Sequence, residues 1–127
     1  MSLHPEYINE LRMDFRGNIR NDPASRILYS TDASIYQIEP LGVAFPKTQE
    51  DLQVAVEFAA KRKIPILARG SGTSLAGQAV GHALILDCSR WLDNIIEINP
   101  EEHYAIVEPG VVLSALNLAA DKYGLMF

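Results

Sequence analysis

The sequence has few cysteines, no long apolar run and no excess of basic residues. It contains a single cysteine, Cys88, so no internal disulfide can form. No apolar run reaches the roughly 18 residues of a membrane-spanning helix, and the N-terminal residues do not resemble a signal peptide. Basic residues number 11 against 16 acidic ones, and the formal charge of −5 disfavours nucleic acid and anionic membranes as partners. These absences predict a cytoplasmic protein without a transmembrane segment.

Histidines are scarce as well, and there are only three: His4, His82 and His103. No two histidines, cysteines or carboxylates have the spacing of metal ligands, so the sequence predicts no metal site. His82 lies near the loop described below, where we expect a hydrogen-bonded loop residue. No catalytic residue is assigned to this chain.

The chain does contain a regular succession of helical and strand-like patterns. They predict helices over residues 5–15, 48–63 and 112–123, strands over 42–46, 64–68 and 83–87, and a hairpin over 95–107. Residues 18–36 are expected to be mostly loop with one turn of helix, and 125–127 to begin another strand. A strand, a helix and a strand with short connections predict a parallel pair in an α+β fold. The ending within an apolar run indicates a fragment of a longer protein.

The most informative segment is Gly70–Gln78, here called the glycine loop, which follows an apolar strand that ends in Arg69. Loops of this composition can turn several backbone N–H groups toward one point, as an anionic phosphate requires. We expect Gly70 and Gly72 to supply unusual φ angles. Arg69 is expected to contact a phosphate or to pair with a nearby carboxylate. Three hydroxyls in the loop add donors: Ser71, Thr73 and Ser74.

Two known phosphate motifs nearly match the glycine loop and fail at defined positions. Gly72 and Gly77 have Walker A spacing, but Gln78 stands where the lysine should be and Ala79 where the Ser or Thr should be, which argues against NTP hydrolysis. The third glycine of a Rossmann fingerprint would fall at Leu75, and no long helix follows. A metal-free site for a pyrophosphate diester remains, and so does the alternative of a plain glycine-rich connection.

Four motifs occur in a fixed order along the chain. They are Tyr29-Ser30-Thr31-Asp32-Ala33-Ser34, Val43-Ala44-Phe45-Pro46-Lys47-Thr48, Arg69 with the glycine loop, and Val107-Glu108-Pro109-Gly110-Val111. Together they resemble the FAD-binding (PCMH-type) domain of the vanillyl-alcohol oxidase superfamily. Within it, the chain is most similar to the group that contains glycolate oxidase and D-lactate dehydrogenase. The arginine–glycine loop followed by the proline–glycine signal is the specific part of this resemblance.

The resemblance implies a fold of two α+β subdomains with FAD between them. Residues 29–127 correspond to the first subdomain, truncated at its C-terminal end, and residues 1–28 to a helix and lead-in. The implied pyrophosphate site is Arg69–Ser74, with Pro46 and Pro109-Gly110 near the adenosine end. The full set of implied FAD-binding residues is Pro46, Arg69, Gly70, Ser71, Gly72, Thr73, Ser74, Gln78, Pro109 and Gly110.

The resemblance also implies how the cofactor is held and what it does. Some relatives attach the flavin through a histidine at the position of Thr73, so the FAD implied here is non-covalent. The implied reaction oxidises a 2-hydroxy acid, such as glycolate or D-lactate, to a 2-oxo acid. Catalytic residues, any iron–sulfur cluster and the substrate site would lie outside this chain, and a second copy or a partner protein could cover its exposed end. Two alternatives stay open: a sugar or aldonolactone oxidase with the same FAD domain, and a non-enzymatic nucleotide- or phosphate-binding module.

Overall fold

The computed structural model describes residues 1–127, and local sequence explains where its helices begin and end. At the start of α3, Thr48 Oγ1 accepts the N–H of Asp51, and Lys63 ends the helix with a left-handed φ of 55°. The elements in chain order are α1 (Pro5–Asp14), β1 (Asn18–Arg20), α2 (Pro23–Leu28), β2 (Gly42–Phe45), α3 (Gln49–Arg62), β3 (Ile66–Arg69), β4 (Leu84–Asp87), β5 (Ile95–Asn99), β6 (Tyr104–Val107) and α4 (Leu113–Asp121).

Four strands form a mixed sheet in the order β1-β2-β4-β3, in which β2, β4 and β3 are parallel and β1 is antiparallel to β2. This sheet and the separate hairpin confirm the expected α+β class. The strands β2 and β3 are parallel, as expected, but they are not neighbours because β4 lies between them. The reason is the apolar character of β4, whose Leu84 and Ile85 have no exposed surface and whose Leu86 is 2% exposed. Such a strand is most stable at the centre of the sheet.

The expectation of a loop-rich segment over residues 18–36 is wrong at its start. Asn18–Arg20 forms β1 and pairs with β2, although Ile19 is its only buried residue. A three-residue edge strand offers too little alternation of apolar and polar residues to be recognised from sequence. The helical turn is present as Pro23–Leu28, where Asp22 caps the first turn by accepting the N–H of Ser25.

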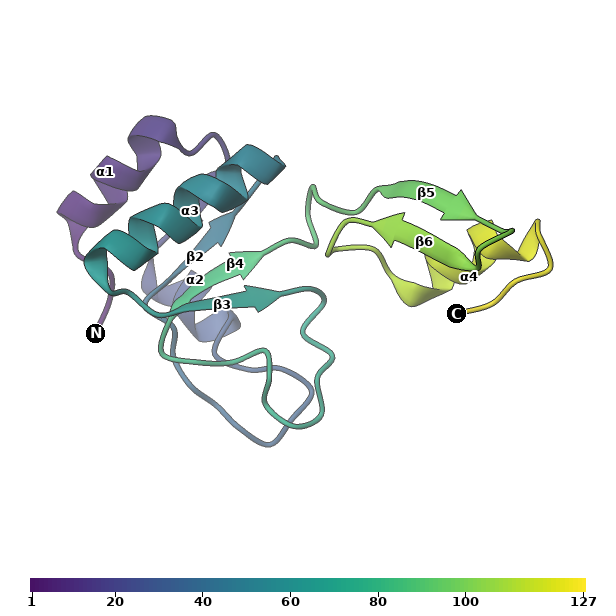
Figure 1. Cartoon of the computed structure of the whole chain (residues 1–127). Coiled ribbons are helices and arrows are strands. Elements are labelled where there is room, and N and C mark those ends of the chain that lie inside the picture. Colours follow the sequence, from purple (N-terminus) through teal and green to yellow (C-terminus); the bar gives the residue numbers. More distant parts are fainter.

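The two faces of the sheet are covered differently. In Figure 1, α1 and α3 lie side by side on one face, and they share with the sheet an apolar cluster that includes Leu11, Phe58 and Leu84. The opposite face carries a smaller cluster around Phe45, against which the Tyr29 ring packs edge-on with its centre 5.8 Å away. Because this cluster is small, polar loops cover the rest of this face of the sheet.

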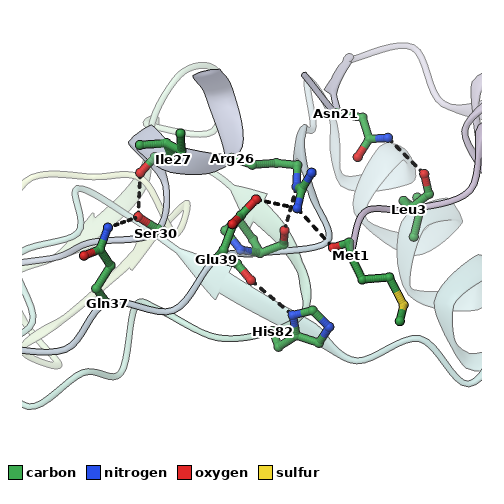
Figure 2. A network of polar contacts seen from close by, with 10 residues as sticks. Met1, Leu3, Asn21, Arg26, Ile27, Ser30, Gln37, Glu39 and His82 are labelled. Atoms are coloured by element: carbon green, nitrogen blue, oxygen red, sulfur yellow. Dashed lines mark hydrogen bonds and ion pairs between the residues drawn. The ribbon is translucent and has the colours of Figure 1, made fainter. Parts of the chain in front are cut away.

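Arg26 in α2 anchors one of these loops and the N-terminus (Figure 2). Its Nε donates to the carbonyl of Pro40 and its Nη2 to the carbonyl of Met1, each at 3.1 Å, and Nη2 also forms an ion pair with Glu39. The Nδ1 atom of His82 lies 3.1 Å from the Glu39 carbonyl oxygen. His82 is therefore a hydrogen-bonded loop residue, as its sequence position predicts.

The antiparallel pair β5 and β6 lies with α4 beyond one end of the four-stranded sheet (Figure 1). Its register is irregular between Ile95 and Glu97. The expected strand over residues 125–127 is wrong, because no strand of this chain lies beside it; instead, the Phe127 N–H donates to the Asn117 side chain at 2.8 Å. None of the four helices combines the length and the apolar character needed to cross a bilayer.

Candidate functional site

The three parallel strands end at one edge of the sheet. They end at Phe45, Arg69 and Asp87, so the connections that follow β2, β3 and β4 start from the same edge. Ligands of open sheets with parallel strands bind at this carboxyl edge. The glycine loop leaves the edge and runs below the sheet in Figure 1, beside residues 31–36.

Two glycines of the glycine loop have left-handed backbone angles: φ is 70° at Gly72 and 81° at Gly77. Gly72 has the unusual φ angle that we expected, whereas the expectation is wrong for Gly70, whose φ is not positive. An added Cβ at Gly70 would meet only the Pro109 carbonyl oxygen, at 3.8 Å. At Gly77 it would lie 2.7 Å from the ring of Tyr36, so this aromatic side chain covers the far end of the loop.

The guanidinium of Arg69 joins the two ends of the glycine loop. Its Nη1 donates to the carbonyl of Ala79, which follows the loop, and to the carbonyl of Thr31, both at 2.9 Å. The guanidinium carbon lies 5.0 Å from the centre of the Tyr29 ring. An added Cβ at Gly72 would lie 2.3 Å from Nη2. The protein partners of Arg69 are therefore carbonyl groups and an aromatic face instead of the carboxylate that was one of our two expectations.

The first half of the glycine loop presents free backbone donors. None of the five N–H groups from Gly70 to Ser74 donates a hydrogen bond within the chain. Ser71 and Thr73 are exposed. The Ser74 hydroxyl bonds the side-chain oxygen of Gln78 and accepts its N–H at 3.2 Å. The loop thus closes on itself at Ser74, and the free N–H groups precede that closure.

A buried carboxylate, Asp87, lies beside Arg69 in the sheet register. It is 5% exposed and accepts the hydroxyl of Tyr29, together with the N–H of Ser89 at 2.8 Å and its hydroxyl at 2.6 Å. Burial and the hydrogen bond to Asp87 raise the pKa of the Tyr29 phenol above its ordinary value. Tyr29 is therefore a neutral donor that connects the segment after α2 to the end of β4.

A second carboxylate, Asp32, caps two backbone groups. Its Oδ1 accepts the N–H of Ser34 at 2.8 Å and its Oδ2 accepts the N–H of Ala79 at 3.3 Å. Hydrogen bonds from Ser34, with smaller contributions from Ala79 and Arg69, hold the pKa of the Asp32 carboxyl below its ordinary value. Close by, the N–H of Ala33 donates to the Gly72 carbonyl at 3.1 Å.

The proline positions differ in what they can contact. Pro46 is fully buried, whereas Pro109 is exposed. Gly110 is packed so closely that an added Cβ would lie 2.2 Å from the carbonyl oxygen of Cys88 and 2.6 Å from that of Leu92. Its N–H donates to the Leu92 carbonyl at 2.7 Å. This contact holds Pro109 beside the start of the glycine loop, while Pro46 supports the edge from within.

Sequence reasoning located the loop and indicated that Asp32 and Asp87 could bind the cofactor or cap backbone groups, but it did not predict the partners of the side chains that hold the loop. The sequence contained a signal for Asp32, because Asp two residues before a turn N–H is typical of an Asx turn. The pairing of Tyr29 with Asp87 joins distant parts of the chain and had no local signal. No group of three or more His, Cys, Asp and Glu side chains in the structure could hold a metal ion.

Comparison with known families agrees with this geometry. A sequence model described as an FAD binding domain matches residues 40–127. The D-2-hydroxyglutarate dehydrogenase of Escherichia coli (strain K12) is 38% identical over 125 residues, which are 95% of this chain and 12% of that protein. The glycolate oxidase subunit GlcD of Bacillus subtilis (strain 168) is 31% identical over 114 residues, which are 87% of this chain and 24% of that protein. The chain spans about an eighth to a quarter of these relatives.

Solved structures show the same fold. An alkyldihydroxyacetonephosphate synthase matches 97% of this chain and 26% of its own with a TM-score of 0.80 at 19% identity. p-Cresol methylhydroxylase with substrate bound matches the same shares with a TM-score of 0.76 at 24% identity. These comparisons confirm the resemblance to PCMH-type FAD-binding domains. The chain belongs to the FAD binding domain family of flavin-dependent oxidoreductases.

Proposed function

We propose that the backbone N–H groups from Gly70 to Ser74 bind the pyrophosphate of FAD. The observation that carries the proposal is that all five groups lack a partner within the chain. Hydrogen bonds to a charged group contribute roughly 1.5–3 kcal/mol each, so three of them contribute about 4.5–9 kcal/mol. This range is comparable with the approximately 8 kcal/mol that corresponds to a micromolar Kd.

The remaining site residues take supporting positions in this proposal. The exposed hydroxyls of Ser71 and Thr73 add donors, and Thr73 offers no imidazole for a covalent link to the flavin. Pro109, held by Gly110 beside the start of the loop, contacts the adenosine end. The buried Pro46 supports that end from within. The cofactor is therefore bound non-covalently.

We further propose that the complete protein oxidises a 2-hydroxy acid to a 2-oxo acid. The names of three relatives include D-2-hydroxyglutarate, glycolate and D-lactate, which all carry a hydroxyl next to a carboxylate. Bound FAD supplies the acceptor for the hydride that leaves the hydroxyl-bearing carbon. This chain binds and orients the cofactor, and the residues that hold the substrate and take its proton belong to the rest of the protein.

Titration of the protein with FAD tests the site, with flavin fluorescence as the readout. Ser71→Glu places a carboxylate beside the pyrophosphate and is expected to raise the FAD Kd about tenfold or more through charge repulsion. Ser71→Gln is the matched control, because it also replaces the hydroxyl and has the length of the glutamate variant but no charge; it should bind FAD at least about tenfold more tightly than Ser71→Glu. Equal FAD affinity of the two variants would contradict the pyrophosphate site. Flavin that stays in the protein pellet after acid precipitation would contradict non-covalent binding.

The reaction is tested on the complete protein under anaerobic conditions. Loss of the visible flavin absorbance on addition of D-2-hydroxyglutarate, D-lactate or glycolate is the expected result. Reduction by aldoses or aldonolactones, with no response to any 2-hydroxy acid, would show that the substrate class is wrong while leaving the cofactor site intact.

A further inference from the structure

Two side chains of opposite charge hold the single residue that follows the glycine loop. Arg69, immediately before the loop, donates through Nη1 to the Ala79 carbonyl at 2.9 Å. Asp32, from a neighbouring segment, accepts the Ala79 N–H through Oδ2 at 3.3 Å. Both hydrogen-bonding groups of Ala79 are therefore used, one by each charge. The two ends of the loop are joined by this arrangement, which we call the Ala79 clamp (Arg69, Asp32 and Ala79).

The clamp extends to the middle of the glycine loop. Arg69 Nη1 also donates to the Thr31 carbonyl at 2.9 Å, and the Ala33 N–H donates to the Gly72 carbonyl at 3.1 Å. The residues on either side of Asp32 are thus fixed to the loop as well. Because Gly72 lies between free N–H groups, the hydrogen bond to its carbonyl sets the plane of the Gly72–Thr73 peptide. The direction of the Thr73 N–H therefore depends on the segment that carries Asp32.

The position of Arg69 is unsuited to a direct phosphate contact through Nη1. That nitrogen already donates to two carbonyls. The guanidinium lies over the ring of Tyr29, whose hydroxyl is fixed by the buried Asp87. Turning the guanidinium toward a ligand would break the contacts that close the loop. Arg69 is held from three sides as part of the structure of the site.

We infer that Arg69 and Asp32 are positioning residues for FAD, which act by closing the glycine loop through Ala79. This inference rests on the proposed function of the loop. It differs sharply from a role for Arg69 as an electrostatic ligand of the pyrophosphate. If charge alone mattered, removing the negative charge of Asp32 would strengthen the binding of an anion. If position matters, removing either charge weakens it.

The test compares the FAD Kd of two variants of opposite charge change. In Asp32→Asn, one side-chain oxygen must replace two acceptors, and in Arg69→Gln the side chain is too short to reach Ala79. Each is expected to raise the FAD Kd about tenfold, as for the loss of a hydrogen bond to a charged group. The double variant is expected to raise it by less than the product of the two, because both side chains hold the same residue, Ala79. Asp93→Asn, at an exposed aspartate, is the matched control and leaves the Kd unchanged.

A second measurement separates positioning from general destabilisation and needs no FAD. Hydrogen exchange of the backbone amides is followed in the wild type and in Asp32→Asn. The Ala79 amide is expected to exchange at least tenfold faster in the variant, while amides of the central strand β4 keep their protection. This result would show local opening of the loop in an otherwise folded chain.

The outcomes separate the inference from the proposed function. If the wild type shows no saturable FAD binding, both fail. If the wild type binds FAD but Asp32→Asn binds it equally well or more tightly, the inference alone is overturned. Unchanged exchange at Ala79 in Asp32→Asn would overturn it as well.

Discussion

Replacing Gly72 with alanine would place a methyl group against the guanidinium of Arg69. The Cβ would lie 2.3 Å from Nη2, 2.8 Å from Cζ and 3.0 Å from Nε. Those distances are shorter than van der Waals contact, so the guanidinium must move. Moving it breaks the hydrogen bonds from Nη1 to the carbonyls of Thr31 and Ala79. The substitution therefore acts on the glycine loop through Arg69.

The expected loss of stability has two parts. The φ of 70° at Gly72 is left-handed, which costs a residue with a Cβ about 1–2 kcal/mol. The two lost hydrogen bonds involve a charged donor that is half-buried, so we take the low end of about 1.5 kcal/mol for each. The sum is about 4–5 kcal/mol, a large share of the approximately 5–15 kcal/mol that stabilises an average domain.

Urea unfolding followed by circular dichroism measures this loss, and Gly124→Ala is the matched control. Gly124 has nearly the same angle, 69°, but an added Cβ there would meet nothing within 4 Å. Both variants reduce the freedom of the unfolded chain equally, so that effect cancels in the comparison. Gly124→Ala should cost only about 1–2 kcal/mol.

The double variant with Arg69→Ala provides a second check. Without the guanidinium, adding Gly72→Ala should cost no more than the backbone contribution, so the two substitutions should be strongly non-additive. Equal destabilisation by Gly72→Ala and Gly124→Ala, or full additivity with Arg69→Ala, would refute the reasoning.

Two further substitutions test contacts that hold the edge of the sheet. Asp51 is 2% exposed and accepts the N–H groups of Arg16 at 2.8 Å and Lys47 at 2.9 Å. Asp51→Ala should therefore lower the free energy of unfolding by about 3 kcal/mol in urea unfolding. The exposed Asp93→Ala is the control and should lower it by less than about 0.5 kcal/mol. The pKa of the Tyr29 phenol is raised in the native chain. The unfolded chain therefore releases the phenol proton at about pH 10 while the native chain keeps it. Stability should fall as the pH rises above about 10. Urea midpoints at about pH 8 and about pH 11 should fall less in Tyr29→Phe than in the wild type, and equal declines would contradict the role of this phenol.

Elements with strong local signals were predictable from the sequence. Thr48 marked the start of α3, and the apolar run of β4 marked a buried strand. The position of β4 between β2 and β3 was not predictable, because it depends on which distant edges are free to pair. β1 was missed for a related reason. Its extended conformation depends on pairing with β2 more than on the propensity of its own three residues.

The candidate site was predictable in its place and only partly in its construction. Glycine and hydroxyl residues indicated a phosphate-binding loop, and Gly72 has the expected conformation. The partners of Arg69 were not predictable, because they are the carbonyls of Thr31 and Ala79, and every residue type offers a carbonyl. These contacts therefore cannot be predicted from the identity of the side chains at positions 31 and 79.

The central place of β4 has a consequence for how the chain assembles. β2 and β3 emerge before β4 during synthesis, and in the finished sheet they do not pair with each other, because β4 lies between them. Their facing backbone groups stay in water until residues 84–87 arrive. Closure of the intervening loop lowers the chain entropy before the central hydrogen bonds of the sheet can form. This entropic cost slows folding. The connection between β3 and β4 carries the candidate cofactor site. The sheet can be completed only after this connection has closed.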